Sequence, residues 1–279
     1  MCRSHRESAT KDGRNRERIN GTIPAIPEYY ASRNSQKYEK KKMSATEIAK
    51  LIDHALLHPT LVDDDIKSGC ETAAKLNVAS VCVKPYTIKL AAELLKGSDV
   101  GVGTVIGFPH GSNASEVKAF EAQVACRDGA VELDMVVNVG KVLQEDWDYV
   151  REDIAAVKKV AESEGAILKV IFETDFVAND AHKIKLCEIC ESLGVDYVKT
   201  STGFGYTKDD SGSYGYTGAT EHDIALMRKS CSDTVGVKAS GGVRTYEDAV
   251  KMRDLGATRL GSSSSEAIVT GEASQQEGY

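Results

Sequence analysis

Short apolar runs rich in β-branched residues recur along this chain, and segments with helical periodicity separate them. Seven such runs lie at 78–85, 99–109, 130–138, 166–174, 195–202, 234–242 and 257–263. A regular alternation of strand and helix predicts parallel strands, because a tight turn cannot join parallel neighbours. Strands this apolar must be covered on both faces. The pattern therefore predicts an α/β fold, either an open doubly wound sheet or a closed barrel.

Counting the strands favours the closed barrel. The segment LIDHALL at 51–57 precedes the first obvious run, and taking it as a strand brings the number to eight. Eight strands with helical crossovers in one unit of this size are typical of an (α/β)8 TIM barrel. Ser44 followed by Glu47 predicts a capping box at the start of an N-terminal helix. We expect a single barrel domain over 43–279, with a flexible tail from about residue 270.

The segment at 113–129 is one of those with helical periodicity between the strands. Its apolar positions are Val117, Phe120, Val124 and Ala125. This spacing predicts an amphipathic helix between the third and fourth strands of the barrel.

Charge is unevenly distributed over the 279 residues. The net charge is −7, yet residues 1–42 carry +6 and the remainder carries −13. The basic residues of this first segment follow no periodic element, which argues against a nucleic-acid-binding domain. We expect a disordered basic arm over 1–42 that is dispensable for catalysis, with Met43 as an alternative start. A transit peptide stays open, although the acidic residues of the arm speak against it.

Cysteine usage and hydropathy indicate a cytoplasmic protein. Seven cysteines are scattered along the chain without an apolar secretory segment at its start, and a reducing compartment explains this odd set most simply. No run approaches the roughly 18 apolar residues of a membrane span. We therefore expect no membrane partner.

Two pairs of metal-ligand-type residues have a simpler explanation. Cys187 and Cys190 form a CxxC, but they lie in an apolar stripe at helical spacing, so we interpret them as helix core rather than as a redox or metal site. His54 and His58 have helical ligand spacing, but no third ligand is evident nearby. The dinucleotide fingerprint, the P-loop and HExxH are all absent. We expect neither a metal nor another cofactor.

Charged residues interrupt strands that should be buried: Asp134, Lys169, Lys199 and Lys238. Burying an unpaired charge is costly, so such residues are rare unless they are paired or used. Residues near the C-terminal ends of barrel strands converge on one mouth, where these enzymes place their chemistry. We therefore expect the four to share a site. Lysines snorkelling outward and a structural ion-pair network are the alternatives.

Two lysines in one enclosed site have a specific chemical use. A free amine with a pKa of about 10.4 is protonated at pH 7, and only its neutral form attacks a carbonyl. A neighbouring ammonium and partial desolvation both lower that pKa. Lys199 and Lys238 therefore predict a lysine that forms a Schiff base.

Glycine- and serine-rich segments follow the last three strands of the predicted barrel. They are TSTGFG at 200–205, SGGVR at 240–244 and GSSSS at 261–265. Glycine lets backbone N–H groups approach an anion, and the loops after the last two strands are the usual phosphate site of such barrels. The sequence predicts a phosphorylated substrate. Arg244 would add charge at the rim or cap the following helix.

In this order and spacing the motifs resemble the deoxyribose-phosphate aldolases, a class I aldolase family. They are LIDHALL, GFPHG, ELDMVVN, LKVIFET, VKTSTGF, VGVKASGGVR and GSSSS, and the resemblance covers about residues 45–270. It implies an (α/β)8 barrel that reversibly cleaves 2-deoxyribose 5-phosphate to acetaldehyde and glyceraldehyde 3-phosphate without a metal. Small phosphorylated sugars and aldehydes would be its partners, and a homodimer or homotetramer is compatible with the family.

The resemblance also implies roles for individual residues. Lys199 would be the Schiff-base nucleophile, Lys238 the ammonium that lowers its pKa, and Asp134 the acid/base. Positions that match phosphate contacts are Thr202, Gly203, Gly241, Gly242, Ser263 and Ser264. Asp53 and Cys82 match positions near the site, with a structural role as the alternative for both.

Other features leave alternatives open. Tyr279 matches a terminal tyrosine that helps protonate an enamine in family members, but a tail without a role is an equal interpretation. The usual short link after TSTGF is replaced by 205–220, a lid or, as we favour, a surface insertion. Phe204 leaves no basic residue directly after Gly203. A different Schiff-base aldolase and a sugar-phosphate-binding pseudoenzyme remain competing functions.

Overall fold

Eight parallel strands close into a barrel in the computed structural model, which describes residues 43–208 and 211–271. The strands are β1 Ile52–Leu56, β2 Ser80–Val83, β3 Gly101–Ile106, β4 Glu132–Val136, β5 Ile167–Ile171, β6 Tyr197–Lys199, β9 Gly236–Ser240 and β10 Arg259–Ser262. β1 pairs with both β2 and β10, which closes the ring. The predicted (α/β)8 barrel is confirmed, and the alternative prediction of an open doubly wound sheet is wrong.

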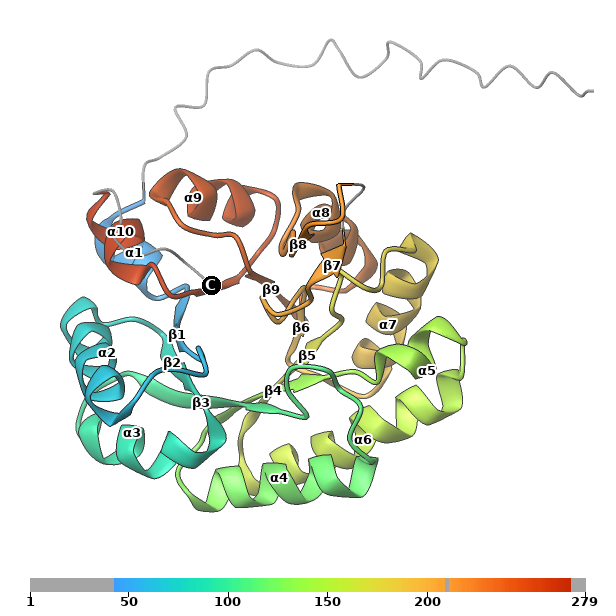
Figure 1. Ribbon diagram of the computed structural model, residues 1–279, viewed down its shortest axis with the longest axis horizontal. Helices are drawn as coiled ribbons and strands as arrows, with labels where there is room; N and C mark the ends of the chain where they lie inside the picture. Colours follow the sequence, from blue (N-terminus) through green and yellow to red (C-terminus); the bar gives the residue numbers. More distant parts are fainter. Residues whose placement is uncertain (1–42, 209–210, 272–279) are drawn as a thin grey trace, which may run out of the picture. The chain divides into compact units, whose positions relative to one another are not determined.

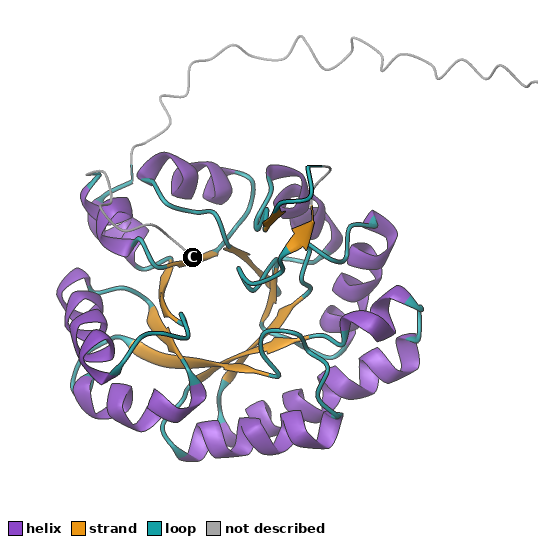
Figure 2. Ribbon diagram, viewed as in Figure 1, coloured by secondary structure: helices purple, strands orange, loops and turns teal. Residues whose placement is uncertain are grey.

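Helices surround the ring of strands on its outside (Figure 1, Figure 2). They are α1 Ala45–Ala49, α2 Asp63–Leu76, α3 Ile88–Leu94, α4 Ser115–Arg127, α5 Val139–Leu143, α6 Trp147–Glu164, α7 Asp180–Ser192, α8 Glu221–Ser230, α9 Tyr246–Asp254 and α10 Ser265–Thr270, with a 3-10 turn η2 at Pro85–Thr87. Within the described ranges, no helix has both the length and the apolar character that crossing a membrane requires.

The first and seventh helices agree with the sequence patterns. α1 begins with the predicted capping box, in which Glu47 N donates to Ser44 Oγ at 3.2 Å and Ser44 N donates to the Glu47 carboxylate at 2.8 Å. Cys187 and Cys190 are buried on α7, as expected for residues of the helix core.

The inserted segment at 205–220 contains a short antiparallel hairpin that sequence patterns did not predict. Its strands are β7 Thr207–Lys208 and β8 Tyr214–Gly215. In the view of Figure 1 this hairpin is drawn in the same part of the picture as α8. The predicted arm at 1–42 and the tail with Tyr279 lie outside the described residues.

Alternate residues of each strand point to opposite sides of the barrel wall. On β4, Leu133 and Met135 belong to the large apolar core, whereas Glu132 and Asp134 are buried polar residues. The same alternation on β5 buries Leu168 among apolar side chains and leaves Lys169 facing the barrel interior. The apolar core therefore lies between strands and helices, and the centre of the barrel is charged.

The predicted helix is present as α4, and Ala125 is buried as expected, but two other positions of the predicted apolar face are exposed. Val117 and Phe120 are 50% and 65% exposed, while Lys118 is completely buried. Lys118 Nζ contacts Asp153 Oδ2 of α6 at 2.6 Å and donates to the Val136 carbonyl at 2.9 Å. A buried ion pair thus replaces an apolar contact between α4 and α6. Its lysine also provides a hydrogen bond for the last carbonyl group of β4.

The Lys118–Asp153 pair gives a stability prediction. Asp153→Ala leaves a buried ammonium without its carboxylate, so we expect the free energy of unfolding to fall by about 3–5 kcal/mol. Urea denaturation followed by circular dichroism measures this change. As a control, Lys67→Ala removes an exposed pair with Asp64 and should leave the midpoint unchanged. An Asp153→Ala variant as stable as the wild type would contradict the prediction.

Candidate active site

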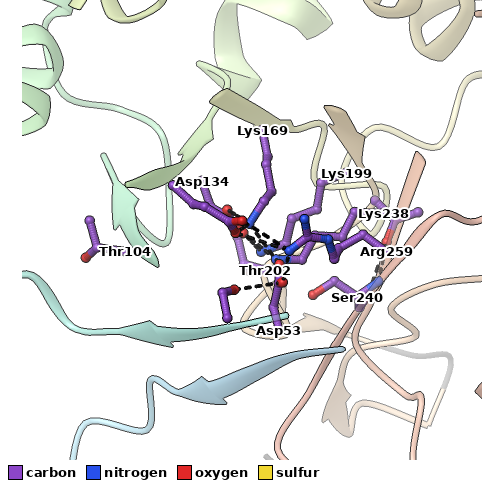
Figure 3. A network of polar contacts seen from close by, with 12 residues as sticks. Asp53, Thr104, Asp134, Lys169, Lys199, Thr202, Lys238, Ser240 and Arg259 are labelled. Carbon is purple, nitrogen blue, oxygen red and sulfur yellow. Dashed lines mark hydrogen bonds and ion pairs between the residues drawn. The ribbon is translucent and has the colours of Figure 1, made fainter. Parts of the chain in front are cut away.

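Seven charged side chains meet inside the barrel, and each is at most 9% exposed. Four are basic and three acidic: Lys169, Lys199, Lys238 and Arg259 with Asp53, Glu132 and Asp134. They come from β1, β4, β5, β6, β9 and β10. Figure 3 shows how most of these side chains point toward one another. We refer to this set as the buried charge cluster.

Asp134 joins the two lysines that the sequence singled out. Its Oδ2 accepts from Lys199 Nζ and from Lys238 Nζ, each at 2.7 Å. Its Oδ1 lies 3.0 Å from Lys169 Nζ as an ion pair, yet it accepts no hydrogen bond of good geometry from the described residues. One oxygen of this carboxylate is therefore shared between two amines, and the other keeps capacity to accept a proton.

Asp53 and Glu132 neutralise the other three cations. Asp53 Oδ2 contacts Lys238 Nζ at 2.5 Å and Lys169 Nζ at 2.8 Å. Its Oδ1 accepts from Arg259 at 2.6 Å, and Glu132 contacts Lys169 at 2.5 Å and Arg259 at 3.2 Å. Lys169, Lys238 and Arg259 each contact at least two carboxylates, whereas among the described residues Lys199 contacts only the carboxylate of Asp134.

This unequal pairing separates the pKa values of the lysines. Burial lowers the pKa of Lys199, and the ammonium of Lys238 adds to that effect against the pull of Asp134. Burial acts in the same direction on Lys238, but Asp134 and Asp53 outweigh it and raise its pKa. The pKa of Lys169 is raised well above its ordinary value, because nearby carboxylates outweigh its burial as well. With four cations against three anions, a neutral Lys199 amine leaves the buried charge cluster without net charge.

A pocket opens above the buried charge cluster at the C-terminal ends of the strands. The predicted site residues that line it are Lys199, Lys238, Thr202, Gly203, Gly241, Gly242, Ser263 and Ser264. Asp53, Cys82 and Arg244 line it as well. Asp134 does not line it and is completely buried, with the Nζ atoms of Lys199 and Lys238 donating to its Oδ2. The structure thus brings the sequence-predicted residues together, in two layers.

The rim of the pocket is built from backbone in the left-handed region. Gly203, Gly241 and Gly242 have φ of 83°, 83° and 82°, a conformation that glycine adopts without strain. Ser262 Oγ donates to the Val243 carbonyl at 2.6 Å and accepts from Ser264 N at 3.0 Å, fixing the loop after β10. Such loops present backbone N–H groups to an anion.

A small apolar cluster lies beside the pocket. It consists of Leu57, Cys82 and Val105 with Phe108 and Phe204 packed against them. The Phe108 and Phe204 rings meet edge to face with centroids 5.4 Å apart. Burial raises the pKa of the Cys82 thiol to about 11, so this residue is a neutral apolar neighbour of the lysines.

Sequence reasoning missed three charged residues at the site: Glu132, Arg259 and Glu173. Glu132 and Arg259 interrupt apolar strands just as the lysines do, so the same signal would have found them. Glu173 follows β5 with a φ of 56° and is only 1% exposed. Its carboxylate accepts from the hydroxyl of Thr202 and from Thr202 N at 3.3 Å. Burial raises its pKa to about 7.

The histidines with ligand-like spacing have separate partners. His54 Nδ1 lies 2.8 Å from Ser265 Oγ, and His58 Nδ1 lies 2.7 Å from Thr60 Oγ1. Burial lowers the pKa of His54 to about 4, so its ring is neutral.

Fold and site together define a barrel enzyme with a buried amine at its mouth, a lyase of the aldolase type. Residues 39–269 match the family model described as DeoC/LacD family aldolase. The chain is 48% identical over 231 residues to the deoxyribose-phosphate aldolase of Thermococcus gammatolerans, covering 82% of this chain and 98% of that protein. It is 50% identical over 222 residues to that of Bacillus cytotoxicus, covering 80% and 94%.

Solved structures show the same likeness. The tetrameric deoxyribose phosphate aldolase from Aeropyrum pernix matches with a TM-score of 0.72 and 31% identity over 81% of this chain and 91% of that one. An aldolase called QR15 matches with a TM-score of 0.72 and 38% identity over 80% and 95%. The chain therefore belongs to the DeoC/LacD family of aldolases, within the deoxyribose-phosphate aldolases.

Glu173 gives a prediction for the pH dependence of stability. Its pKa rises from the ordinary 4.5 to about 7 on folding, so the folded protein binds more protons between these values than the unfolded chain. The free energy of unfolding should therefore fall between pH 5 and pH 8, by as much as about 3 kcal/mol from this group. Urea denaturation at both pH values would show a smaller fall in Glu173→Gln. Equal falls in both proteins would disprove it.

Proposed function

We propose that this chain is a Schiff-base aldolase that reversibly cleaves 2-deoxy-D-ribose 5-phosphate to D-glyceraldehyde 3-phosphate and acetaldehyde, in the catabolism of deoxyribose phosphate. The observation that carries the proposal is the pairing of Lys199. Among the four cations of the buried charge cluster, Lys199 has a single carboxylate partner and a lowered pKa. Its side chain also lines the pocket whose rim is formed by Gly203, Gly241 and Gly242, which we call the glycine rim.

Lys199 is the nucleophile of the proposed reaction. Its neutral amine adds to the C1 aldehyde of the open-chain sugar, and the C1 oxygen takes a proton from the ammonium of Lys238 and leaves as water to give an iminium. A base then removes the C3 hydroxyl proton. The electrons of the C2–C3 bond move toward the iminium nitrogen, and glyceraldehyde 3-phosphate departs. The enamine is protonated at C2, and water releases acetaldehyde and restores the amine.

Asp134 and Lys238 handle the protons of these steps. Asp134 is ionised because Lys169, Lys199 and Lys238 outweigh its burial and hold its pKa well below the ordinary value. It accepts the C3 proton through a water, and Lys238, on the same oxygen, shares in the transfer. A proton can therefore pass between substrate, carboxylate and second lysine without a net charge being left in the barrel.

The phosphate of the substrate binds at the glycine rim. Backbone N–H groups near Gly203, Gly241, Gly242, Ser263 and Ser264, together with the Thr202 hydroxyl, surround the anion. Arg244 lines the same end of the pocket and supplies a positive charge that Phe204 does not. We place the C1 aldehyde at Lys199, which lines the same pocket.

The remaining assignments complete the proposal. The barrel from residue 43 onward is the catalytic domain, and the arm at 1–42 takes no part in the chemistry. We place the enzyme in the cytoplasm, where reduced cysteines persist; the described cysteines are all free thiols. Assembly as a homodimer or homotetramer is favoured by the tetrameric relative from Aeropyrum pernix.

Borohydride trapping tests the proposed chemistry. Reduction in the presence of deoxyribose 5-phosphate should attach a two-carbon or sugar adduct to Lys199, which peptide mass spectrometry would locate. Lys199→Ala should lose at least about 10³-fold in kcat, because no other amine at the site has a lowered pKa. Lys84→Ala is the matched control, since within the described part of the chain Lys84 donates to backbone carbonyls such as Leu61 O and does not line the pocket.

Three outcomes separate the competing functions. An adduct with deoxyribose 5-phosphate at Lys199 and turnover supports the proposal. An adduct only with another phosphorylated carbonyl compound indicates a different Schiff-base aldolase. Phosphate-dependent binding without any adduct indicates a pseudoenzyme. A Lys199→Ala variant that keeps its activity would contradict the proposed mechanism.

A further inference from the structure

The residues that directly follow the inserted hairpin, 217–219, are anchored to the glycine rim. We refer to these three residues as the root of the hairpin. Asp175, in the loop after β5, accepts from Thr217 N at 2.6 Å and from Gly218 N at 3.1 Å. Ala219 N donates to the Gly241 carbonyl at 3.0 Å. Three backbone N–H groups of the root are therefore fixed, two by one carboxylate and one by the rim itself.

Packing at the root leaves no space for side chains. Gly218 has a φ of 72°, and a Cβ there would lie 2.6 Å from the Gly241 carbonyl oxygen. A Cβ at Gly241 would lie 3.0 Å from Gly218 Cα and 3.8 Å from Gly203 Cα. Backbone before the hairpin, backbone after it and backbone after β9 thus come close together at the expected phosphate site.

Tyr216 sits directly before this root and lines the pocket. Its Cε2 lies 3.5 Å from the position of a Cβ on Gly241, so the ring flanks the rim closely. The Tyr206 ring packs against it edge to face with centroids 5.7 Å apart. Tyr214 of the same hairpin is 70% exposed and does not line the pocket.

We propose that Tyr216 is a specificity-determining residue, an aromatic wall which the inserted segment adds to the phosphate end of the pocket. The inference rests on the proposed phosphate site. A ring held against one side of a bound phosphate excludes water, and N–H···O contacts to the anion strengthen where the local dielectric is lower. The wall therefore favours phosphorylated over unphosphorylated substrates, and the insertion is more than a surface loop.

Two measurements on Tyr216→Ala test this inference. Isothermal titration calorimetry with inorganic phosphate should show about five- to tenfold weaker binding than in the wild type. The ratio of kcat/KM for deoxyribose 5-phosphate to that for deoxyribose should fall by a similar factor, with kcat/KM for deoxyribose itself unchanged. An unchanged ratio, or an equal loss with both substrates, would overturn the inference.

Matched variants isolate the ring and its support. Tyr216→Phe keeps the ring and should behave as the wild type; a loss equal to that of Tyr216→Ala would contradict an aromatic wall. Tyr214→Ala changes the same hairpin away from the pocket and should have no effect on either measurement. Asp175→Ala releases the root, and it should lower phosphate affinity in the same direction as Tyr216→Ala.

Failure of the inference is distinguishable from failure of the proposed function. Binding of inorganic phosphate does not depend on Lys199 chemistry, so the calorimetric comparison decides the role of Tyr216 even in a protein without turnover. Conversely, normal trapping at Lys199 with identical phosphate binding in Tyr216→Ala would overturn only the role of Tyr216.

Discussion

The excess of one cation in the buried charge cluster is the constraint on which the site depends. A barrel interior excludes water, so four basic groups cannot all stay charged against three carboxylates without a large electrostatic penalty. The number of carboxylate contacts determines which basic group loses its proton most readily. Lys169, Lys238 and Arg259 are each held by at least two carboxylates, and Lys199 only by Asp134. The network that stabilises three cations thereby favours a neutral amine at the fourth position, the one that faces the pocket.

The pocket divides its tasks between strands and loops. The strands carry the charged groups, whose positions are fixed by the regular alternation of the barrel wall, while glycine-rich loops shape the opening. Gly203, Gly241 and Gly218 approach one another so closely that backbone, rather than side chains, forms the rim. The inserted segment uses this same contact as its anchor, which gives Tyr216 a fixed place at the edge of the site. Loop variation on a constant barrel thus changes the pocket without disturbing the buried charge cluster.

Sequence patterns predict the barrel and much of the site because each signal follows from burial. Charged residues such as Asp134, Lys199 and Lys238 stand out in strands that must be apolar, and glycine runs mark the rim. Glu132 and Arg259 give the same signal and were overlooked. Lys118 contradicted simple periodicity, since its partner on α6 is distant in sequence and makes a buried charge tolerable. The approach of Tyr216 to the rim depends on Asp175, 41 positions earlier, and no local pattern contains that contact.

The pKa of Lys199 is the property on which the proposed chemistry depends. It can be obtained from the pH dependence of acetylation by acetic anhydride, with Lys199 and Lys238 resolved by peptide mass spectrometry. We expect the amine of Lys199 to titrate below 10.5 and that of Lys238 above it. We also expect Lys238→Leu to raise the pKa of Lys199, because a neighbouring positive charge is removed. A Lys199 that titrates at or above its ordinary value, or that is unaffected by Lys238→Leu, would contradict the proposed chemistry.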